Sequence, residues 1–253
     1  MVPVISFIVP ALNEEKNLPP LIDRLLTIER GSGYPCEILI VNDASVDNTY
    51  AVSSELAKQH TQVRVLHKDP PRGIGNSIRT ALPQVRGRVA IVVMADGVDP
   101  LESAVPQFCH KVLGEGCQLV LLSRHATPSD SKSIPLSYKF FHWGFRLLTR
   151  YALGIEFRDT TYAFRAFDPN FVRSLPLNSR GFEISPEITF KTVFTGGKVG
   201  EVTGRQTRRV HGKSKFRFSK AFRGYSRVLL EAAWLRLQGK TLAHTRESDA
   251  MRS

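Results

Sequence analysis

The sequence has few cysteines. Three thiols occur among 253 residues, at Cys36, Cys109 and Cys117, and no two of them form a C-x-x-C pair. An odd number of dispersed cysteines does not build the disulfide framework of a small secreted domain. We therefore expect reduced thiols and a cytosolic setting.

Long hydrophobic runs are also missing. No apolar run approaches the roughly 20 residues that a helix needs to cross a bilayer. Met1-Val-Pro3 leads directly into a strand pattern, without the basic leader of a signal peptide. We expect a chain that is soluble or bound to a membrane surface. Its length suits one large domain, or one domain with a tail.

Acidic residues are outnumbered. The chain has 35 Lys and Arg against 23 Asp and Glu, a formal net charge of +12. Between Arg205 and Arg223 stand eight basic residues and no acidic one. Such a block is typical of a surface that meets phosphate groups, an anionic membrane or nucleic acid, although a solvated basic face is the alternative.

Apolar runs alternate with helical patterns along the first half of the chain. The runs predict strands at 4–9, 37–42, 62–67, 89–95 and 118–123. The helical patterns lie at 14–28, 49–59, 75–82, 101–113 and, rich in aromatics, 138–153. This alternation predicts an α/β fold with a mostly parallel sheet and helices on both faces. The polar segment 126–135 is expected to be a mobile loop that orders over a ligand, and the residues from Lys240 onward are expected to fray.

Acidic side chains follow several of the predicted strands. Residues 10–14 come after the first strand, Asp43 ends the second, and Asp96 and Asp99 follow the fourth. In open α/β sheets, ligands bind at the carboxyl ends of the strands. These strand ends indicate a nucleotide site. Asp96 and Asp99 also suit Mg²⁺ or Mn²⁺, which one or two carboxylates and substrate phosphates hold, whereas an Asx turn is the structural alternative.

A glycine turn precedes the third helical pattern. Gly73-Ile-Gly-Asn76 would let the backbone approach an anion at a helix N-terminus. The signal is weak because such turns are common, and the missing G-K-[ST] excludes a P-loop.

Together these motifs resemble those of the family 2 glycosyltransferases, and within them the dolichyl-phosphate mannose synthase type. The resemblance covers about residues 4–230. Eight pieces match in the family's order: Val9-Pro-Ala-Leu-Asn-Glu-Glu15, Val41-Asn-Asp-Ala-Ser-Val-Asp-Asn-Thr49, Gly73-Ile-Gly-Asn76, Met94-Ala-Asp96, Ser123-Arg124, Asp159-Thr-Thr161 with Phe164-Arg-Ala-Phe167, Gly181-Phe-Glu183 with Glu187, and Gly212-Lys-Ser-Lys-Phe216.

The resemblance implies a GT-A fold and a nucleoside-diphosphate sugar as donor. It assigns donor binding to Pro10, Ala11, Asn13, Glu14, Asp43, Gly73, Asn76 and Asp96. The family's metal motif is usually Asp-x-Asp, and Met94 replaces the first Asp here. Asp96 is then the expected ligand of Mg²⁺ or Mn²⁺, with Asp99 as a second oxygen directly or through water. The replacement leaves a strict metal requirement open.

The resemblance also implies a lipid-phosphate acceptor. It assigns acceptor-phosphate contacts to Arg124, Lys139, Arg208, Arg209, His211, Ser214 and Lys215. Asp96, Arg124 and Lys139 are the expected catalytic residues. For Arg124 and Lys139 the alternative is ordinary solvation at the surface.

The expected mechanism follows from the charge of the acceptor. A neutral hydroxyl needs a general base, whereas a phosphate is already anionic at neutral pH. Metal and basic groups would stabilise the departing diphosphate in an in-line, inverting displacement. Asp159 is expected to order the acceptor-side loop and Glu187 to form a structural pair. Residues 206–210 lack the Trp of the processive Q-x-x-R-W motif, which argues against polysaccharide synthesis.

We expect a glycosyltransferase domain over 1–223 and an amphipathic helix with a polar tail over 224–253. The helical stripe of Val228, Leu229, Ala232 and Leu235, widened by Trp234 and Leu230, fits either a membrane interface or core packing. The enzyme would act at the cytosolic face of a membrane, by peripheral contact or through a membrane partner. The rival functions are transfer to a hydroxyl and a non-catalytic nucleotide- or polyanion-binding module; nucleic-acid binding is weaker, because the basic block belongs to the matched motifs.

Overall fold

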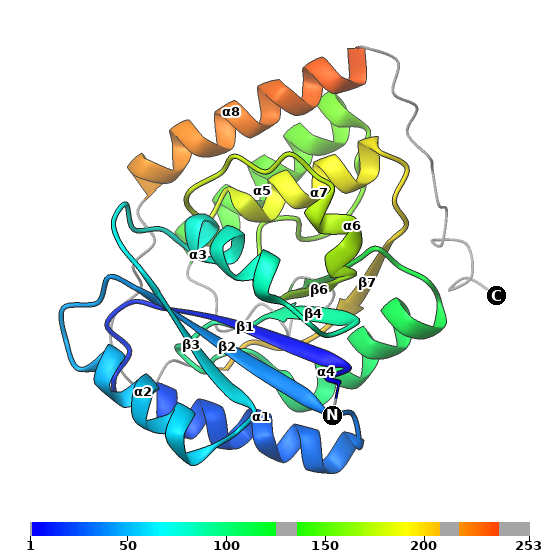
Figure 1. Ribbon diagram of the computed structural model, residues 1–253. Helices are drawn as coiled ribbons and strands as arrows, with labels where there is room; N and C mark the ends of the chain where they lie inside the picture. The colour runs from blue at the N-terminus through cyan, green and yellow to red at the C-terminus, as the bar shows by residue number, and fades with distance from the viewer. Residues whose placement is uncertain (1, 125–135, 208–217, 238–253) are drawn as a thin grey trace.

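The computed structural model describes residues 2–124, 136–207 and 218–237, and a central sheet runs through them (Figure 1). Its strands are β1 Ile5–Ala11, β2 Cys36–Asp43, β3 Val63–Lys68, β4 Val89–Val92, β5 Leu119–Ser123, β6 Arg165–Phe167 and β7 Val199–Thr203. They form a 7-stranded sheet in the order β3-β2-β1-β4-β6-β5-β7. All the strands predicted from the sequence are confirmed, with small shifts at their ends.

Strand direction decides where the functional residues meet. β1 runs parallel to β2 and β4, β2 to β3, and β5 to β7, whereas β6 is antiparallel to both β4 and β5. The carboxyl ends of the other six strands therefore share one edge with the start of β6. The mostly parallel sheet is confirmed. The reversed strand β6 was not predicted, because three residues are too few to give a periodic signal.

Helices cover both faces of the sheet, as predicted (Figure 1). The α-helices are α1 Leu18–Ser32, α2 Thr49–Gln59, α3 Ile74–Ala81, α4 Leu101–Cys109, α5 Leu136–Leu148, α6 Pro169–Arg173, α7 Ile184–Phe194 and α8 Phe218–Leu237. Short helical turns are η1 Leu82–Gln84, η2 His110–Gly114 and η3 Thr149–Leu153. The first helix begins four residues later than predicted, because residues 14–17 form a turn and Pro19 suits only a first helical turn.

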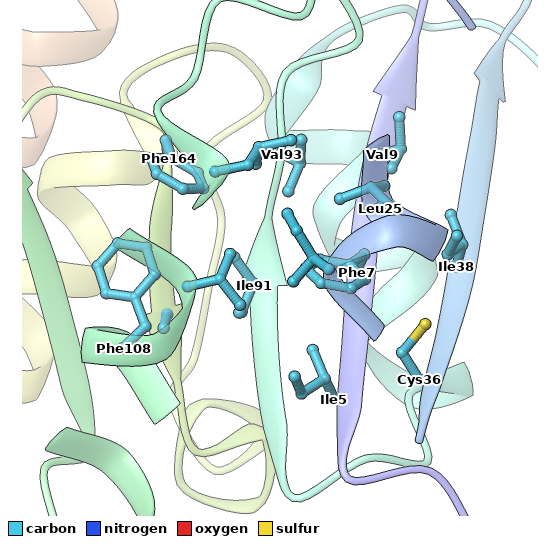
Figure 2. Close-up of a cluster of buried hydrophobic side chains, with 14 of the residues drawn as sticks. Ile5, Phe7, Val9, Leu25, Cys36, Ile38, Ile91, Val93, Phe108 and Phe164 are labelled. Carbon is cyan, nitrogen blue, oxygen red and sulfur yellow. The ribbon is translucent and has the colours of Figure 1, made fainter. Parts of the chain in front are cut away.

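Alternating side chains of β1 build two cores. Ile5, Phe7 and Val9 point to the face covered by α1 and α4, where Phe108 packs (Figure 2). Ile8 belongs to the opposite core, beneath α3, α5, α7 and α8. The three cysteines are free and buried, so the prediction of reduced thiols is confirmed.

The last described helix, α8, is part of the second core. Its Tyr225, Val228 and Ala232 are buried, and Glu231 forms a 2.8 Å ion pair with Lys191 of α7. Core packing is thus confirmed for Val228, Leu229, Ala232 and Leu235, whereas Trp234 and Leu230, which widen the stripe, are exposed. A membrane role for these exposed residues stays a prediction. The boundary expected between residues 223 and 224 falls inside this continuous helix. Within the described parts of the chain, no helix has the length and apolarity to cross a membrane.

Candidate functional site

The loops after β1 and β2 are bound to each other. The Asn13 backbone N–H donates to Ser45 Oγ at 3.0 Å, and Asn13 Oδ1 accepts from the Val46 N–H at 2.9 Å. The Glu14 N–H donates to Thr49 Oγ1 at 2.8 Å. Asn13 adopts a left-handed φ of 52°, a conformation that Asn tolerates well. The first two strand ends, which carry most of the expected donor residues, are therefore one structural unit that also holds Pro10 and Ala11 at the end of β1.

Asp43 lies at the end of β2 with its carboxylate buried. Its Oδ1 forms a 2.7 Å ion pair with Nζ of Lys68, the residue opposite it on β3. Its Oδ2 accepts from the Gly73 N–H at 2.7 Å. The buried charge is thus compensated from the adjacent strand and from the turn before α3. The structure joins the expected donor residues Asp43 and Gly73 directly.

The glycine turn differs from the sequence-based expectation. A Cβ on Gly73 would lie 2.2 Å from the Arg180 carbonyl oxygen, and one on Gly75 would lie 2.5 Å from that of Ser179. The N–H of Asn76 donates to the same Arg180 oxygen at 3.1 Å. The glycines allow close approach of another backbone segment, which occupies the helix N-terminus where an anion was expected.

The turn after β4 separates the two expected metal ligands. Asp96 is partly exposed, whereas Asp99 is fully buried. Asp99 Oδ2 accepts from the Met94 N–H at 2.8 Å, and Oδ1 accepts from the hydroxyl of Tyr162. Burial, followed by the charge of Asp96, raises the pKa of Asp99 to about 7. Asp99 therefore holds the turn in place through hydrogen bonds to both of its oxygens. Its expected role as a second metal oxygen, directly or through water, stays a prediction.

The described residues do not form a closed metal cage. No group of three or more His, Cys, Asp and Glu side chains suited to a metal ion occurs in the ranges that the structure describes. A single hard carboxylate at Asp96 nevertheless fits Mg²⁺ or Mn²⁺ that takes its other ligands from substrate phosphates and water.

Arg124 follows β5 and belongs to a ring of hydrogen bonds. Its Nε donates to Asp159 Oδ2 at 2.9 Å, and its Nη2 lies 3.2 Å from His142 Nε2. His142 Nδ1 lies 2.7 Å from Thr161 Oγ1, which donates to Asp159 Oδ1 at 2.9 Å. A guanidinium only donates, so His142 Nε2 accepts, and Nδ1 carries the proton and donates to Thr161. The ring therefore closes with a neutral imidazole.

The ring keeps Arg124 ionised although its side chain is buried. Burial alone would lower its pKa, but the Asp159 carboxylate raises the pKa of Arg124 above its ordinary value. Asp159 also accepts from the backbone N–H groups of Thr161 and Tyr162. Asp159 therefore orders this loop, as predicted, and the loop's place on the acceptor side stays a prediction.

Sequence reasoning missed two residues of this site. His142 lies on α5, and Tyr162 lies in the segment before β6 with its ring centroid 4.0 Å from Arg124 Cζ. His142 was hidden in an aromatic helical pattern. Tyr162 immediately follows the matched Asp159-Thr-Thr161 motif. That position could have identified it, because a buried tyrosine usually places its hydroxyl against a polar partner.

Of the other residues expected to bind the acceptor phosphate, the structure describes only Lys139. Lys139 is half-buried on α5, one turn before His142. The basic residues Arg208, Arg209, His211, Ser214 and Lys215 lie outside the described residues.

The two glutamates of the matched Gly181-Phe-Glu183 and Glu187 motif accept hydrogen bonds from nearby backbone N–H groups. Glu187 accepts from the N–H groups of Asn178 and Ser179 at 2.9 and 2.8 Å and pairs with Lys191 at 2.7 Å. The predicted structural pairing of Glu187 is confirmed, with a partner on its own helix. Glu183 Oε1 accepts from the Gly181 N–H at 3.0 Å.

The sequence is similar to a family model and to named relatives. A sequence model described as Glycosyl transferase family 2 matches residues 6–175. An undecaprenyl-phosphate mannosyltransferase of Micrococcus luteus is 30% identical over 82% of this chain and 85% of its own. A dolichyl-phosphate beta-glucosyltransferase of Trichomonas vaginalis is 27% identical over 78% of this chain and 64% of its own, so the chain spans less than two thirds of that relative.

A solved structure shows the fold. Glucosyl-3-phosphoglycerate synthase of Mycobacterium tuberculosis, in complex with Mn²⁺ and UDP-glucose, superposes with a TM-score of 0.67 at 20% identity. The match covers 92% of this chain and 79% of that one. The GT-A fold expected from the sequence is confirmed.

Proposed function

The chain belongs to glycosyl transferase family 2, and on that premise we propose that it transfers a sugar from a nucleoside-diphosphate donor to a polyprenyl phosphate. The names of the relatives support this acceptor, since one is an undecaprenyl-phosphate and another a dolichyl-phosphate glycosyltransferase. The first is named a mannosyltransferase and the second a glucosyltransferase, so the sugar that this chain transfers must be found by experiment.

The observation that carries the proposal is the buried, ionised Arg124. A cation fixed at the carboxyl edge of the sheet suits an acceptor phosphate, which it would bind through a planar donor fork. Asp43, Asp99 and Asp159 are each held by hydrogen bonds or ion pairs, so none of these three is placed as a free general base. An anionic acceptor does not need one.

The donor would bind across the joined loops after β1 and β2. Asn13, Glu14 and Asp43 would face the nucleoside, and Asp96 would hold Mg²⁺ or Mn²⁺ on the diphosphate. The bound metal would supply Lewis-acid stabilisation of the leaving diphosphate. The solved relative that binds Mn²⁺ with UDP-glucose supports such a donor complex. Attack by the acceptor phosphate from the side of Arg124 would invert the anomeric centre.

Exposed aromatic side chains support a peripheral membrane position. Five of them lie on α5, η3 and α8: Phe140 is 75% exposed, Trp143 62%, Tyr151 78%, Phe222 68% and Trp234 60%. The positively charged Arg146 on α5 and Arg150 on η3 are exposed as well. Aromatic and basic groups together favour the interface of an anionic membrane, which we propose to be its cytosolic face.

The test is sugar transfer by the purified chain. It would be incubated with Mn²⁺ or Mg²⁺, labelled GDP- and UDP-sugars and undecaprenyl or dolichyl phosphate in detergent, and label extracted into organic solvent would be counted. We expect label from one donor, at least tenfold less label with Asp96→Ala, and loss of label on chelation by EDTA. Donor hydrolysis without lipid label would contradict the acceptor, and label unchanged by Asp96→Ala would contradict the role of that carboxylate.

A further inference from the structure

One side chain, Tyr162, touches both halves of the proposed site. Its hydroxyl donates to Asp99 in the turn after β4, and its ring lies under the guanidinium of Arg124 after β5. We propose that Tyr162 is a positioning residue that fixes the donor-side turn and the acceptor-side arginine relative to each other. The inference rests on the proposed function, which assigns one half of the site to the donor and the other to the acceptor. The contacts of Tyr162 do not depend on that assignment.

The hydroxyl acts on the donor side through Asp99. Asp99 Oδ1 accepts from Tyr162, and Oδ2 accepts from the Met94 N–H at 2.8 Å. Met94 begins the Met94-Ala-Asp96 turn, so the carboxylate of Asp99 ties that turn to Tyr162. Removing the hydroxyl would leave a buried carboxylate oxygen without this donor and release the turn that carries Asp96.

The ring acts on the acceptor side. Arg124 Cζ lies 4.0 Å from the ring centroid, within cation–π range. The backbone N–H of Tyr162 also donates to Asp159 Oδ1 at 3.2 Å, and Asp159 is the ion-pair partner of Arg124. The same residue therefore sets both the surface under the guanidinium and the carboxylate at its edge.

The environment of Tyr162 excludes a role as general base. Its side chain is buried, with 7% of the residue exposed. Burial and the charge of Asp99 hold the pKa of Tyr162 well above its ordinary value. The phenol therefore stays neutral and donates, and its contribution to the reaction is geometric.

Two substitutions separate the two contacts. Tyr162→Phe removes the hydroxyl and keeps the ring, whereas Tyr162→Leu removes both. Phe164→Leu is the matched control, because Phe164 is buried in the same core as Tyr162, with ring centroids 6.3 Å apart, and packs against Phe108.

Three quantities would be measured for each variant: the Kd of the product nucleoside diphosphate with Mn²⁺, obtained by calorimetry without acceptor, the KM of the polyprenyl phosphate, and Tm. Tyr162→Phe should weaken nucleotide binding about tenfold, as expected for losing a hydrogen bond to a buried carboxyl group, and leave the acceptor KM within about twofold. Tyr162→Leu should also raise the acceptor KM about tenfold, because the cation–π contact is lost. Phe164→Leu should lower Tm alone.

The inference is overturned if both Tyr162 variants lower Tm but leave nucleotide affinity and acceptor KM at the wild-type values, as a purely structural residue would. It is also overturned if Phe164→Leu changes these constants as much as Tyr162→Leu does. Failure of the proposed function gives a different result: wild-type protein would transfer no sugar to lipid. In that case nucleotide Kd decides the donor-side contact by itself, with weakening by Tyr162→Phe supporting it and an unchanged value refuting it.

Discussion

Arg124 is a buried arginine whose charge is compensated on one side by Asp159. The neutral imidazole of His142 accepts from it without adding charge, and the ring of Tyr162 covers one of its faces. Each contact depends on the planar shape of the guanidinium as well as on its charge. The position therefore requires arginine and not merely a cation.

We expect Arg124→Lys to keep the charge and lose most of the activity. An ammonium cannot reach Asp159 and His142 at once and stack on Tyr162, so kcat/KM for the polyprenyl phosphate should fall by roughly two orders of magnitude. The Kd of the nucleoside diphosphate should change little, because Arg124 lies outside the proposed donor loops.

Steady-state kinetics and calorimetry would be run on Arg124→Lys beside Arg88→Lys, the same exchange at an exposed site just before β4. Near-wild-type acceptor kinetics in Arg124→Lys would show that only charge matters at this position, and the proposed phosphate fork would be wrong.

At the scale of single elements, α5 connects the surface to the site. His142 faces the Arg124 ring, and Phe145 is buried against the second core. Phe145 meets Tyr225 of α8 edge to face at 5.2 Å and stacks with Phe190 of α7 at 6.3 Å. This aromatic contact joins three helices and fixes the rotation of α5 that points His142 inward.

Phe145→Ala should therefore destabilise the fold strongly. Loss of a buried phenyl ring typically costs about 3–5 kcal/mol, and this site can close the gap only by moving α5. Phe140→Ala makes the same change on the same helix at a side chain that is 75% exposed, and should cost no more than about 0.5 kcal/mol. Urea unfolding followed by circular dichroism measures both. Equal losses in the two variants would contradict the placement of α5 on the core.

The elements also show how far the sequence determines the site. Strand ends at Asp43, Asp96 and Arg124 were predictable, because buried runs and turn residues mark them locally. The roles of Gly73 and Asp99 were not, since each depends on a partner distant in sequence: the Arg180 carbonyl for the glycine and the Tyr162 hydroxyl for the carboxylate. The same holds for β6, whose reversed direction brings the Asp159 loop to the shared edge of the sheet.

On the scale of the whole molecule, charge and exposed aromatics favour the same partner. The chain carries a formal net charge of +12, and Trp143 and Trp234 are exposed on α5 and α8, two helices of the same core layer (Figure 1). Arg236 at the end of α8 donates to the Ala152 carbonyl of η3 at 2.6 Å. This hydrogen bond joins α8 to η3, the turn that follows α5. Electrostatic attraction would bring this surface to anionic lipid, and the indole rings would enter the headgroup region.

Binding should therefore require both anionic lipid and the tryptophans. We expect the protein to sediment with vesicles of phosphatidylcholine and phosphatidylglycerol, and not with phosphatidylcholine alone. About 0.5 M NaCl should release most of it, because the Debye length then shrinks to about 4 Å. Trp143→Ser with Trp234→Ser should weaken vesicle binding about tenfold or more, since interfacial aromatic anchors are lost, whereas Tyr34→Ser changes an exposed aromatic elsewhere and should not. Retention of full vesicle binding by the double variant would place the membrane contact on another surface, and equal binding to neutral vesicles would remove the electrostatic part of the argument.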